Sequence, residues 1–207
     1  DTADVYVRGD EALVELTERF DGVKLSARQL LVTAPTPKVD AKLQRAAAAA
    51  HKNIAAFAKR SLRKNWWMRN AQGAAVGEKF EPFERVGIYI PGGTAPLVST
   101  VLMTVTLAKV AGCQEIVVCT PPPVNPNLLY ACRKAGATEV YQLGGAQAIA
   151  VMALGTGTIK GVQKILRENG PRYVIEIGRA EARARAPQDG RGDGQNNVHL
   201  FTRDKGG

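Results

Sequence analysis

Histidine and cysteine, the side chains that most often bind transition metals, are scarce in this sequence. Its 207 residues include two histidines and three cysteines. The cysteines are odd in number, lie in apolar or helical surroundings and form no C-x-x-C pair, which disfavours a disulfide framework or a thiolate zinc site. We therefore expect three buried free thiols, at Cys113, Cys119 and Cys132.

Long apolar runs are also missing. No run reaches the roughly 18 residues that a membrane-spanning helix needs, and no charged and then apolar leader opens the chain. We expect no membrane association and a cytoplasmic location. The composition, 45% hydrophobic and 23% charged, is that of a globular protein of one or two domains.

Acidic residues are outnumbered, so the formal net charge is +9 and a nucleic-acid partner has to be considered. The charge is uneven, because residues 86–159 carry only three basic and two acidic groups and must form the core. The densest basic stretch is residues 51–70. Basic groups on the solvated face of an amphipathic helix explain it better than phosphate contacts, and we expect no nucleic-acid partner.

Helical patterns dominate the first third of the chain. Residues 9–20 have apolar side chains at helical spacing, with Asp10 as the expected N-cap. Residues 39–62 are rich in alanine and contain no Gly or Pro, which predicts a long helix. Residues 66–83 lose this periodicity and gain glycines, which indicates an extended or hairpin segment.

Three strand-then-helix units follow. Short apolar runs rich in β-branched residues predict strands, and each leads through a turn into an unbroken helical stretch. The expected strands are residues 86–90, 115–119 and 139–143, and the expected helices are residues 97–111, 127–135 and 146–154. Repeats of 20–30 residues are typical of parallel crossovers. The sequence therefore predicts an α/β fold, a Rossmann-like doubly wound parallel sheet preceded by a helical segment.

Two glycine turns of this pattern are candidate ligand-binding loops. They are residues 91–94, after the first strand, and residues 144–147, after the third, and each has a polar side chain, Thr94 or Gln147, at the helix start. Such loops present free N–H groups at the carboxyl edge of a sheet. Neither loop has the G-x-G-x-x-G spacing, and no acidic residue ends the second strand. From spacing alone, ligand binding and a purely structural tight turn both remain open.

Three stretches resemble one known family. They read RVGIYIPGGTAPLVS (residues 85–99), AKVAGCQEIVVCTPPP (residues 108–123) and AGATEVYQLGGAQAI (residues 135–149). These stretches look like histidinol dehydrogenase. The resemblance implies oxidation of L-histidinol to L-histidine through histidinal, with two molecules of NAD reduced, in a zinc-dependent homodimer.

The resemblance also implies cofactor-binding positions. In the family's V-G-x-Y-x-P-G-G motif, the tyrosine falls on Tyr89 and the proline two positions later falls on Pro91. The glutamine of G-G-A-Q-A falls on Gln147. A tyrosine at a strand end can contact a ribose or base, and a side-chain amide can bind hydroxyls. We therefore predict Tyr89, Pro91 and Gln147 as NAD-binding residues.

Beyond about Ile165 the chain departs from the family pattern. Family members continue with K-I-F-G-P-G-N, whereas this chain reads KILRENGP at residues 164–171, which leaves Asn169 out of register with the family's cofactor-binding asparagine. The family's zinc ligands, a glutamine, two histidines and an aspartate, and its glutamate–histidine pair have no match here. Residues 178–207 resemble nothing in the family and have the composition of a disordered tail.

This departure sets the remaining expectations. His51 lies in the alanine-rich helix and His199 in the unmatched tail, so neither has the neighbours of a ligand set or general base. We predict no catalytic and no metal-binding residue in this chain. The expected parts are residues 1–85, a helical portion of a first domain, residues 86–177, the NAD-binding domain, and the tail.

Two functional interpretations remain. The first is a histidinol dehydrogenase by descent, represented by its N-terminal and cofactor-binding portion and inactive alone. The second is a non-catalytic NAD-binding or dimerising remnant. A basic nucleic-acid-binding protein, which the net charge alone suggests, is the weakest alternative.

Overall fold

The computed structural model describes residues 2–92 and 96–155. The predicted polar tail, residues 178–207, lies outside these residues, as do Thr94 and Asn169. The described chain forms two compact units. The predicted domain boundaries, near residues 85 and 177, remain predictions.

The smaller unit has residues 62–81 as its described part. It is an antiparallel hairpin of β1 (Trp66–Arg69) and β2 (Ala75–Glu78), which confirms the predicted hairpin. The indole N–H of Trp66 donates a 2.8 Å hydrogen bond to the carboxylate of Glu78 across the hairpin. All four residues of β1 are exposed.

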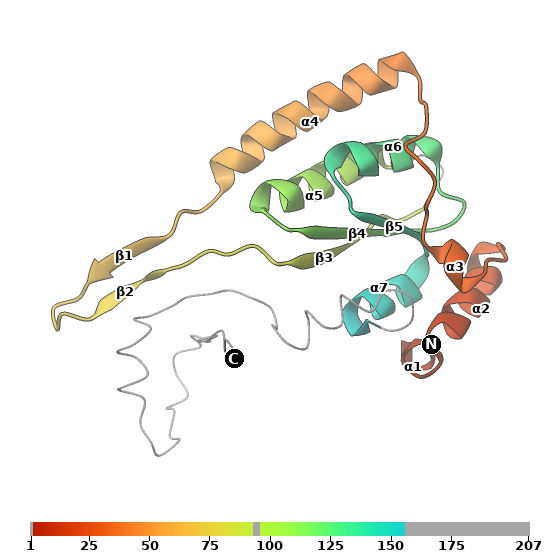
Figure 1. The fold of residues 1–207 in the computed structure, drawn as a ribbon, viewed down its shortest axis with the longest axis horizontal. Coiled ribbons are helices and arrows are strands. Elements are labelled where there is room, and N and C mark those ends of the chain that lie inside the picture. The colour runs from red at the N-terminus through yellow and green to blue at the C-terminus, as the bar shows by residue number, and fades with distance from the viewer. Residues whose placement is uncertain (1, 93–95, 156–207) are drawn as a thin grey trace. The chain divides into compact units, whose positions relative to one another are not determined.

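The larger unit is built on a three-stranded parallel sheet (Figure 1). Its strands are β3 (Arg85–Tyr89), β4 (Glu115–Thr120) and β5 (Glu139–Gln142). They lie side by side in chain order, with Val118 paired to Ile88 on one side and to Val140 on the other. The prediction of parallel pairing is confirmed, and the fold is α/β with a parallel sheet.

Helices cover both faces of this sheet (Figure 1). They are α5 (Val98–Ala111), α6 (Pro126–Ala135) and α7 (Gly145–Leu154). Helices α5 and α6 cover one face, and α7 covers the other, where it contacts β3. Right-handed crossovers, the usual hand between neighbouring parallel strands, place consecutive helices such as α5 and α6 on one face. In doubly wound sheets, the helix after the third strand crosses to the opposite face of the sheet, as α7 does here, and the second half of the fold begins there.

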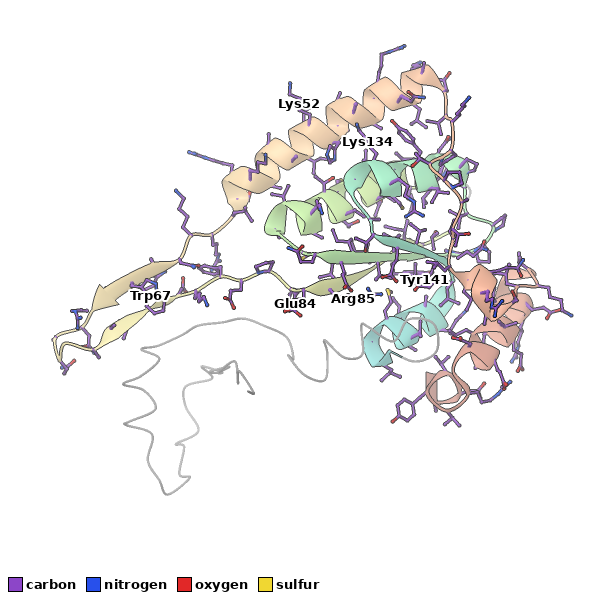
Figure 2. The ribbon with its side chains drawn as sticks, in the orientation of Figure 1. Lys52, Trp67, Glu84, Arg85, Lys134 and Tyr141 are labelled. Carbon is purple, nitrogen blue, oxygen red and sulfur yellow. The ribbon has the colours of Figure 1, made fainter. Side chains whose placement is uncertain are left out.

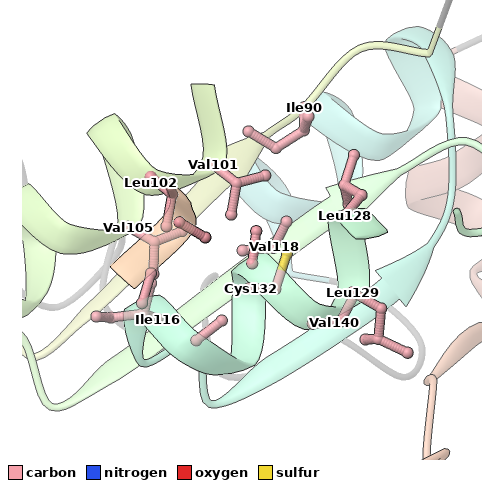
Figure 3. Packing of buried hydrophobic residues seen from close by; sticks show 14 of the residues in the cluster. Ile90, Val101, Leu102, Val105, Ile116, Val118, Leu128, Leu129, Cys132 and Val140 are labelled. Carbon is pink, nitrogen blue, oxygen red and sulfur yellow. The ribbon is translucent and has the colours of Figure 1, made fainter. Parts of the chain in front are cut away.

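Alternation along β4 divides the core into two clusters. Ile116 and Val118 point to the side of α5 and α6, where they meet Val101 and Cys132 (Figure 3). Val117 and Cys119 point to the opposite side, where α7 packs. All of these strand residues are fully buried, which is the pattern of a parallel sheet covered on both faces.

The helices that precede the sheet join both clusters. They are α1 (Thr2–Arg8), α2 (Asp10–Asp21), α3 (Ala27–Leu30) and α4 (Ala41–Ser61). Leu13 and Leu16 of α2 pack with the α7 cluster, and Ala47 of α4 packs with the α5 cluster. The prediction that Asp10 caps α2 is wrong: Gly9 holds the cap position and Asp10 is the first helical residue. The short α1 immediately before it places the chain reversal at Gly9.

Helix α4 carries three of the six Lys and Arg side chains of the basic stretch, residues 51–70. Lys52, Lys59 and Arg60 are exposed, and Lys52 extends outward from the helix (Figure 2). Towards α5, the Nδ1 atom of His51 lies 3.0 Å from the hydroxyl oxygen of Thr106. The interpretation of the basic stretch as a solvated helix face is confirmed for α4.

None of the helices in the described part of the chain combines the length and apolar character needed to cross a bilayer.

The segment after α3 closes one edge of the sheet. Leu31 forms an isolated antiparallel bridge with Tyr141, and the N–H of Val32 donates a 2.8 Å hydrogen bond to the carbonyl of Val140. The guanidinium of Arg133 in turn donates to the carbonyl of Val32 at 3.0 Å. The outer edge of β5 is therefore already hydrogen-bonded.

Candidate functional site

A pocket of about 610 Å³ opens at the carboxyl ends of β3 and β4. Its walls come from the segments that follow each of the three strands and from the end of α2. The described lining residues are Asp21, Tyr89, Pro91, Gly92, Pro96, Leu97, Thr120, Pro121, Pro122, Pro123, Asn125, Leu128 and Gly145. The carboxyl edge of a parallel sheet is where open α/β folds bind ligands, because loops there lead into helix N-termini with free N–H groups.

Tyr89 connects the end of β3 to the start of α7. Its hydroxyl oxygen accepts a 3.0 Å hydrogen bond from the backbone N–H of Gly145, the first residue of the helix. That N–H is one of the donors without a partner inside the helix. Gly145 has a φ of 62°, a left-handed conformation that favours glycine. This contact fixes the position of the tyrosine ring at the pocket wall.

Gln147 lies on the first turn of α7 and is only 6% exposed. Its side chain folds back beside Gly145, where a Cβ atom would lie 2.5 Å from its Oε1 atom. Its Nε2 atom is buried and has no hydrogen-bond partner in the described chain. Of the three predicted cofactor residues, Tyr89 and Pro91 line the pocket together, whereas Gln147 lies behind Gly145 and is absent from the lining.

Asp21 is a lining residue that the sequence did not identify. In the sequence it only marks the end of a helix, 68 residues before Tyr89. The structure brings it against Gly144, where a Cβ atom would lie 3.1 Å from both carboxylate oxygens. No motif or spacing could have shown this approach, because it depends on how α2 packs against α7.

A second helix N-terminus borders the pocket at Asn125. The side-chain Oδ1 of Asn125 accepts a 2.8 Å hydrogen bond from the N–H of Asn127, and Pro126 occupies the first helical position of α6. The cap therefore uses one free donor of the helix, and the proline has none. The wall between Asn125 and Thr120 is formed by three prolines, which give it a rigid apolar surface.

His51, the histidine that the structure describes, does not line this pocket. His51 bonds to Thr106 on the far side of α5, and His199 lies outside the described residues. Within residues 2–92 and 96–155, no three His, Cys, Asp or Glu side chains lie close enough to hold a metal ion. The prediction of no metal ligands in the whole chain remains a prediction.

The cysteines are buried and free, as predicted. Burial raises the pKa of the Cys119 thiol to about 12, and it does the same for the Cys132 thiol. Neutral thiols are poor nucleophiles and poor metal ligands. The three cysteine side chains of this protein pack in the hydrophobic core.

Comparison with known proteins identifies the family. The histidinol dehydrogenase family model matches residues 2–180. The chain is 43% identical over 180 residues to histidinol dehydrogenase from Photobacterium profundum, covering 86% of this chain and 40% of that protein. It is 46% identical over 172 residues to the enzyme from Geobacillus kaustophilus, covering 79% of this chain and 40% of that one.

A solved structure agrees with the fold described above. The crystal structure of histidinol dehydrogenase from Elizabethkingia anophelis superposes with a TM-score of 0.71 at 35% identity, over 76% of this chain and 38% of that one. The chain thus spans about two fifths of the length of the relatives that it matches. With a family model that matches most of its residues, the chain belongs to the histidinol dehydrogenase family.

Proposed function

We propose that the pocket at the carboxyl edge of the sheet binds NAD. The observation that supports this most directly is the placement of the pocket, between the segments after β3 and β4 and beside the N-terminus of α7. Open α/β sheets bind dinucleotides at this edge. The family resemblance implies NAD as the cofactor, and two of the three implied positions, Tyr89 and Pro91, line the pocket.

The polar atoms around the pocket fit a dinucleotide. Within the described residues, the buried Nε2 atom of Gln147 and the buried Oδ2 atom of Asp21 have no hydrogen-bond partner, and ligand hydroxyls could supply one to each. For Gln147 to reach the ligand, its side chain must turn out from behind Gly145. The proline wall offers an apolar surface for a base ring.

We further propose that this chain supplies the cofactor-binding portion of an enzyme that oxidises L-histidinol to L-histidine in two NAD-dependent steps. Bound NAD supplies the hydride acceptor. The role of this chain is to hold and orient the dinucleotide through Tyr89, Pro91 and Gln147. The described residues do not fit the family's zinc ion, because no three His, Cys, Asp or Glu side chains among them come together as ligands.

Calorimetric titration of NAD into the 207-residue chain and into Gln147→Ala tests the site. We expect the substitution to weaken binding by about 2- to 13-fold, the equivalent of one hydrogen bond worth about 0.5–1.5 kcal/mol. Gln114→Ala is the matched control, because Gln114 is exposed and the hydrogen bond of its side-chain amide goes to the nearby carbonyl of Gly112. Absence of NAD binding to the unmodified chain would refute the proposal, and so would binding that is equal in all three proteins.

We also propose that the chain forms a homodimer, as the resemblance implies. The hairpin exposes Trp66 by 46%, Trp67 by 51% and Met68 by 54%. A two-stranded hairpin with exposed aromatic side chains has no core of its own, and contact with a second copy would bury this surface.

Light scattering after size exclusion should give twice the mass of the chain. Trp67→Glu should give the single mass, with Lys64→Glu unchanged as the control, and a monomeric parent chain would contradict the proposal.

A further inference from the structure

Asp21 is the acidic side chain of the pocket, and it comes from outside the strand and helix repeats. It is the last residue of α2, and its carboxyl group contacts the turn after β5 at Gly144. The same turn packs against the loop after β4, since a Cβ atom on Gly144 would also lie 2.9 Å from Cγ of Pro121. The carboxylate therefore lies where the segments following two neighbouring strands meet, at the pocket wall.

One oxygen of this carboxylate lacks a hydrogen-bond partner among the residues that the structure describes. Its Oδ2 atom is buried and accepts no hydrogen bond in the described part of the chain. Lys24, the basic residue that follows α2, lies 3.9 Å from Glu18 instead. Removal of the Asp21 carboxyl group from water raises its pKa above the ordinary value. An unpaired buried carboxylate is unfavourable for the folded chain, and donors supplied by a ligand would relieve it.

A purely structural role, as a cap for α7, does not fit these observations. The first N–H of the helix, that of Gly145, is bonded to Tyr89 and not to Asp21. A carboxylate that is stabilised by a helix N-terminus has a lowered pKa, whereas that of Asp21 is raised. Its position next to α7 thus brings the folded chain little stabilisation.

We propose that Asp21 accepts hydrogen bonds from the hydroxyls of a ribose of NAD and selects a ribose over a phosphate at this point of the pocket. The inference rests on NAD binding in this pocket. Rossmann-type folds place an acidic side chain after their second strand for the same purpose. Here that strand, β4, ends at Thr120 and continues into Pro121, so the acid comes from α2 instead.

The geometry of the group suits a ribose. The two oxygens of a carboxylate can each accept from one of two neighbouring hydroxyls, and rotation about the Cβ–Cγ bond presents either oxygen to the pocket. A phosphate at the same position would place its charge next to the carboxylate, which is unfavourable in a partly desolvated site. The site therefore favours the unphosphorylated sugar.

Asp21→Asn tests this role, with Glu11→Gln as the matched control on the exposed side of the same helix. NAD binding is measured by calorimetry and thermal unfolding is measured without ligand. The amide keeps the size of the side chain but loses the charge and one acceptor. We expect Asp21→Asn to weaken NAD binding about tenfold or more and to raise the unfolding temperature of the free chain, while Glu11→Gln changes neither.

Weaker NAD binding together with a higher unfolding temperature of the free chain distinguishes a ligand-binding role of Asp21 from a structural role. A lower unfolding temperature together with weaker binding would show that Asp21 only supports the fold, and would overturn the inference. Binding of NAD that is unchanged by Asp21→Asn would overturn it while leaving the proposed function intact. If no variant binds NAD, the proposed function and this inference both fail.

Two half-ligands, AMP and nicotinamide mononucleotide, show which ribose is bound. Each contains one of the two riboses of NAD, so Asp21→Asn should weaken binding of one of them as much as binding of NAD. If binding of NAD is weakened but binding of both mononucleotides is unchanged, the assignment to a ribose is wrong. Titration of NADP into both proteins provides the phosphate comparison. If the affected half is AMP, Asp21→Asn should reduce the ratio of the affinity for NAD to the affinity for NADP. An unchanged ratio would contradict selection against phosphate.

Discussion

The guanidinium of Arg85 on β3 donates a 2.8 Å hydrogen bond to the carboxylate of Glu139 on β5, although β4 lies between the two strands. Arg85, labelled in Figure 2, also pairs with Glu115 on β4, so one cation connects all three strands. Its side chain is only 7% exposed. The hydroxyl of Tyr141 donates to the same carboxylate of Glu139 at 2.8 Å. This cluster lies at the amino ends of the strands, opposite the pocket.

Loss of this arginine should destabilise the sheet. Arg85→Met removes the cation and leaves the partly buried Glu139 without its main partner, and breaking a buried pair on one side costs about 3–5 kcal/mol. Because Glu139 is 27% exposed, we expect a loss of about 2–3 kcal/mol in the free energy of unfolding, measured with urea. Lys59→Met, at an exposed position on α4, is the control. A loss of less than about 1 kcal/mol would show that water replaces the arginine.

The same cluster predicts a pH dependence. Hydrogen bonds from Arg85 lower the pKa of Glu139 below its ordinary value of 4.5, against the opposing effect of burial. A carboxylate with a lowered pKa in the folded state stabilises the protein fully above the unfolded-state pKa, and this contribution is lost as the pH falls through the folded-state pKa. The free energy of unfolding should therefore decline below about pH 4.5, and Glu139→Gln should make this decline shallower. A parallel decline in parent and variant would assign the effect to other carboxylates.

The contact between Tyr89 and Gly145 should contribute measurably to the stability of α7. Tyr89→Phe removes the acceptor of the Gly145 N–H, and we expect a loss of about 0.5–1.5 kcal/mol in the free energy of unfolding. Tyr130→Phe, on α6, is the matched control. If both variants lose the same amount, the measured loss does not come from this hydrogen bond.

Residues 1–207 alone should not oxidise L-histidinol. Hydride transfer from an alcohol needs a positioned proton acceptor, whose loss typically costs 10²–10⁴-fold in rate. The chain has two histidines, and His51 is already bonded to Thr106. We expect no NADH from the chain with L-histidinol, NAD and zinc, by absorbance, beyond a protein-free control. NADH formation that is abolished by Tyr89→Ala would contradict this expectation.

Much of the larger unit could be predicted from the sequence, because each of its strands and helices has a recognisable pattern within its own short segment. Buried parallel strands appear as short β-branched runs, and the turns between them contain Gly or Pro. For example, the strand expected at residues 115–119 is observed at Glu115–Thr120, and the helix expected at residues 127–135 is observed at Pro126–Ala135. The predicted strand at residues 86–90 begins one residue earlier, at Arg85, since its charged side chain finds partners on the neighbouring strands.

What the sequence could not show depends on contacts between distant segments. The four residues of α3 are too few for a periodic pattern, and the bridge from Leu31 to Tyr141 spans over one hundred positions. The approach of Asp21 to Gly144 is of the same kind. The motif predicts Gln147 as a cofactor-binding residue, which stays a prediction, and it does not show the side-chain rotamer that folds the amide back beside Gly145.

The short segment at Leu31 and Val32 also decides where this sheet can grow. It bridges to Tyr141 and bonds to the carbonyl of Val140, so it obstructs the outer edge of β5 for a further strand. At the other margin of this sheet, no strand of the described residues pairs with the outer edge of β3. The edge of β3 is thus the more accessible place for a new strand, whether from the same polypeptide or from another. The pocket next to Tyr89 would then lie in the middle of a wider sheet instead of at its margin.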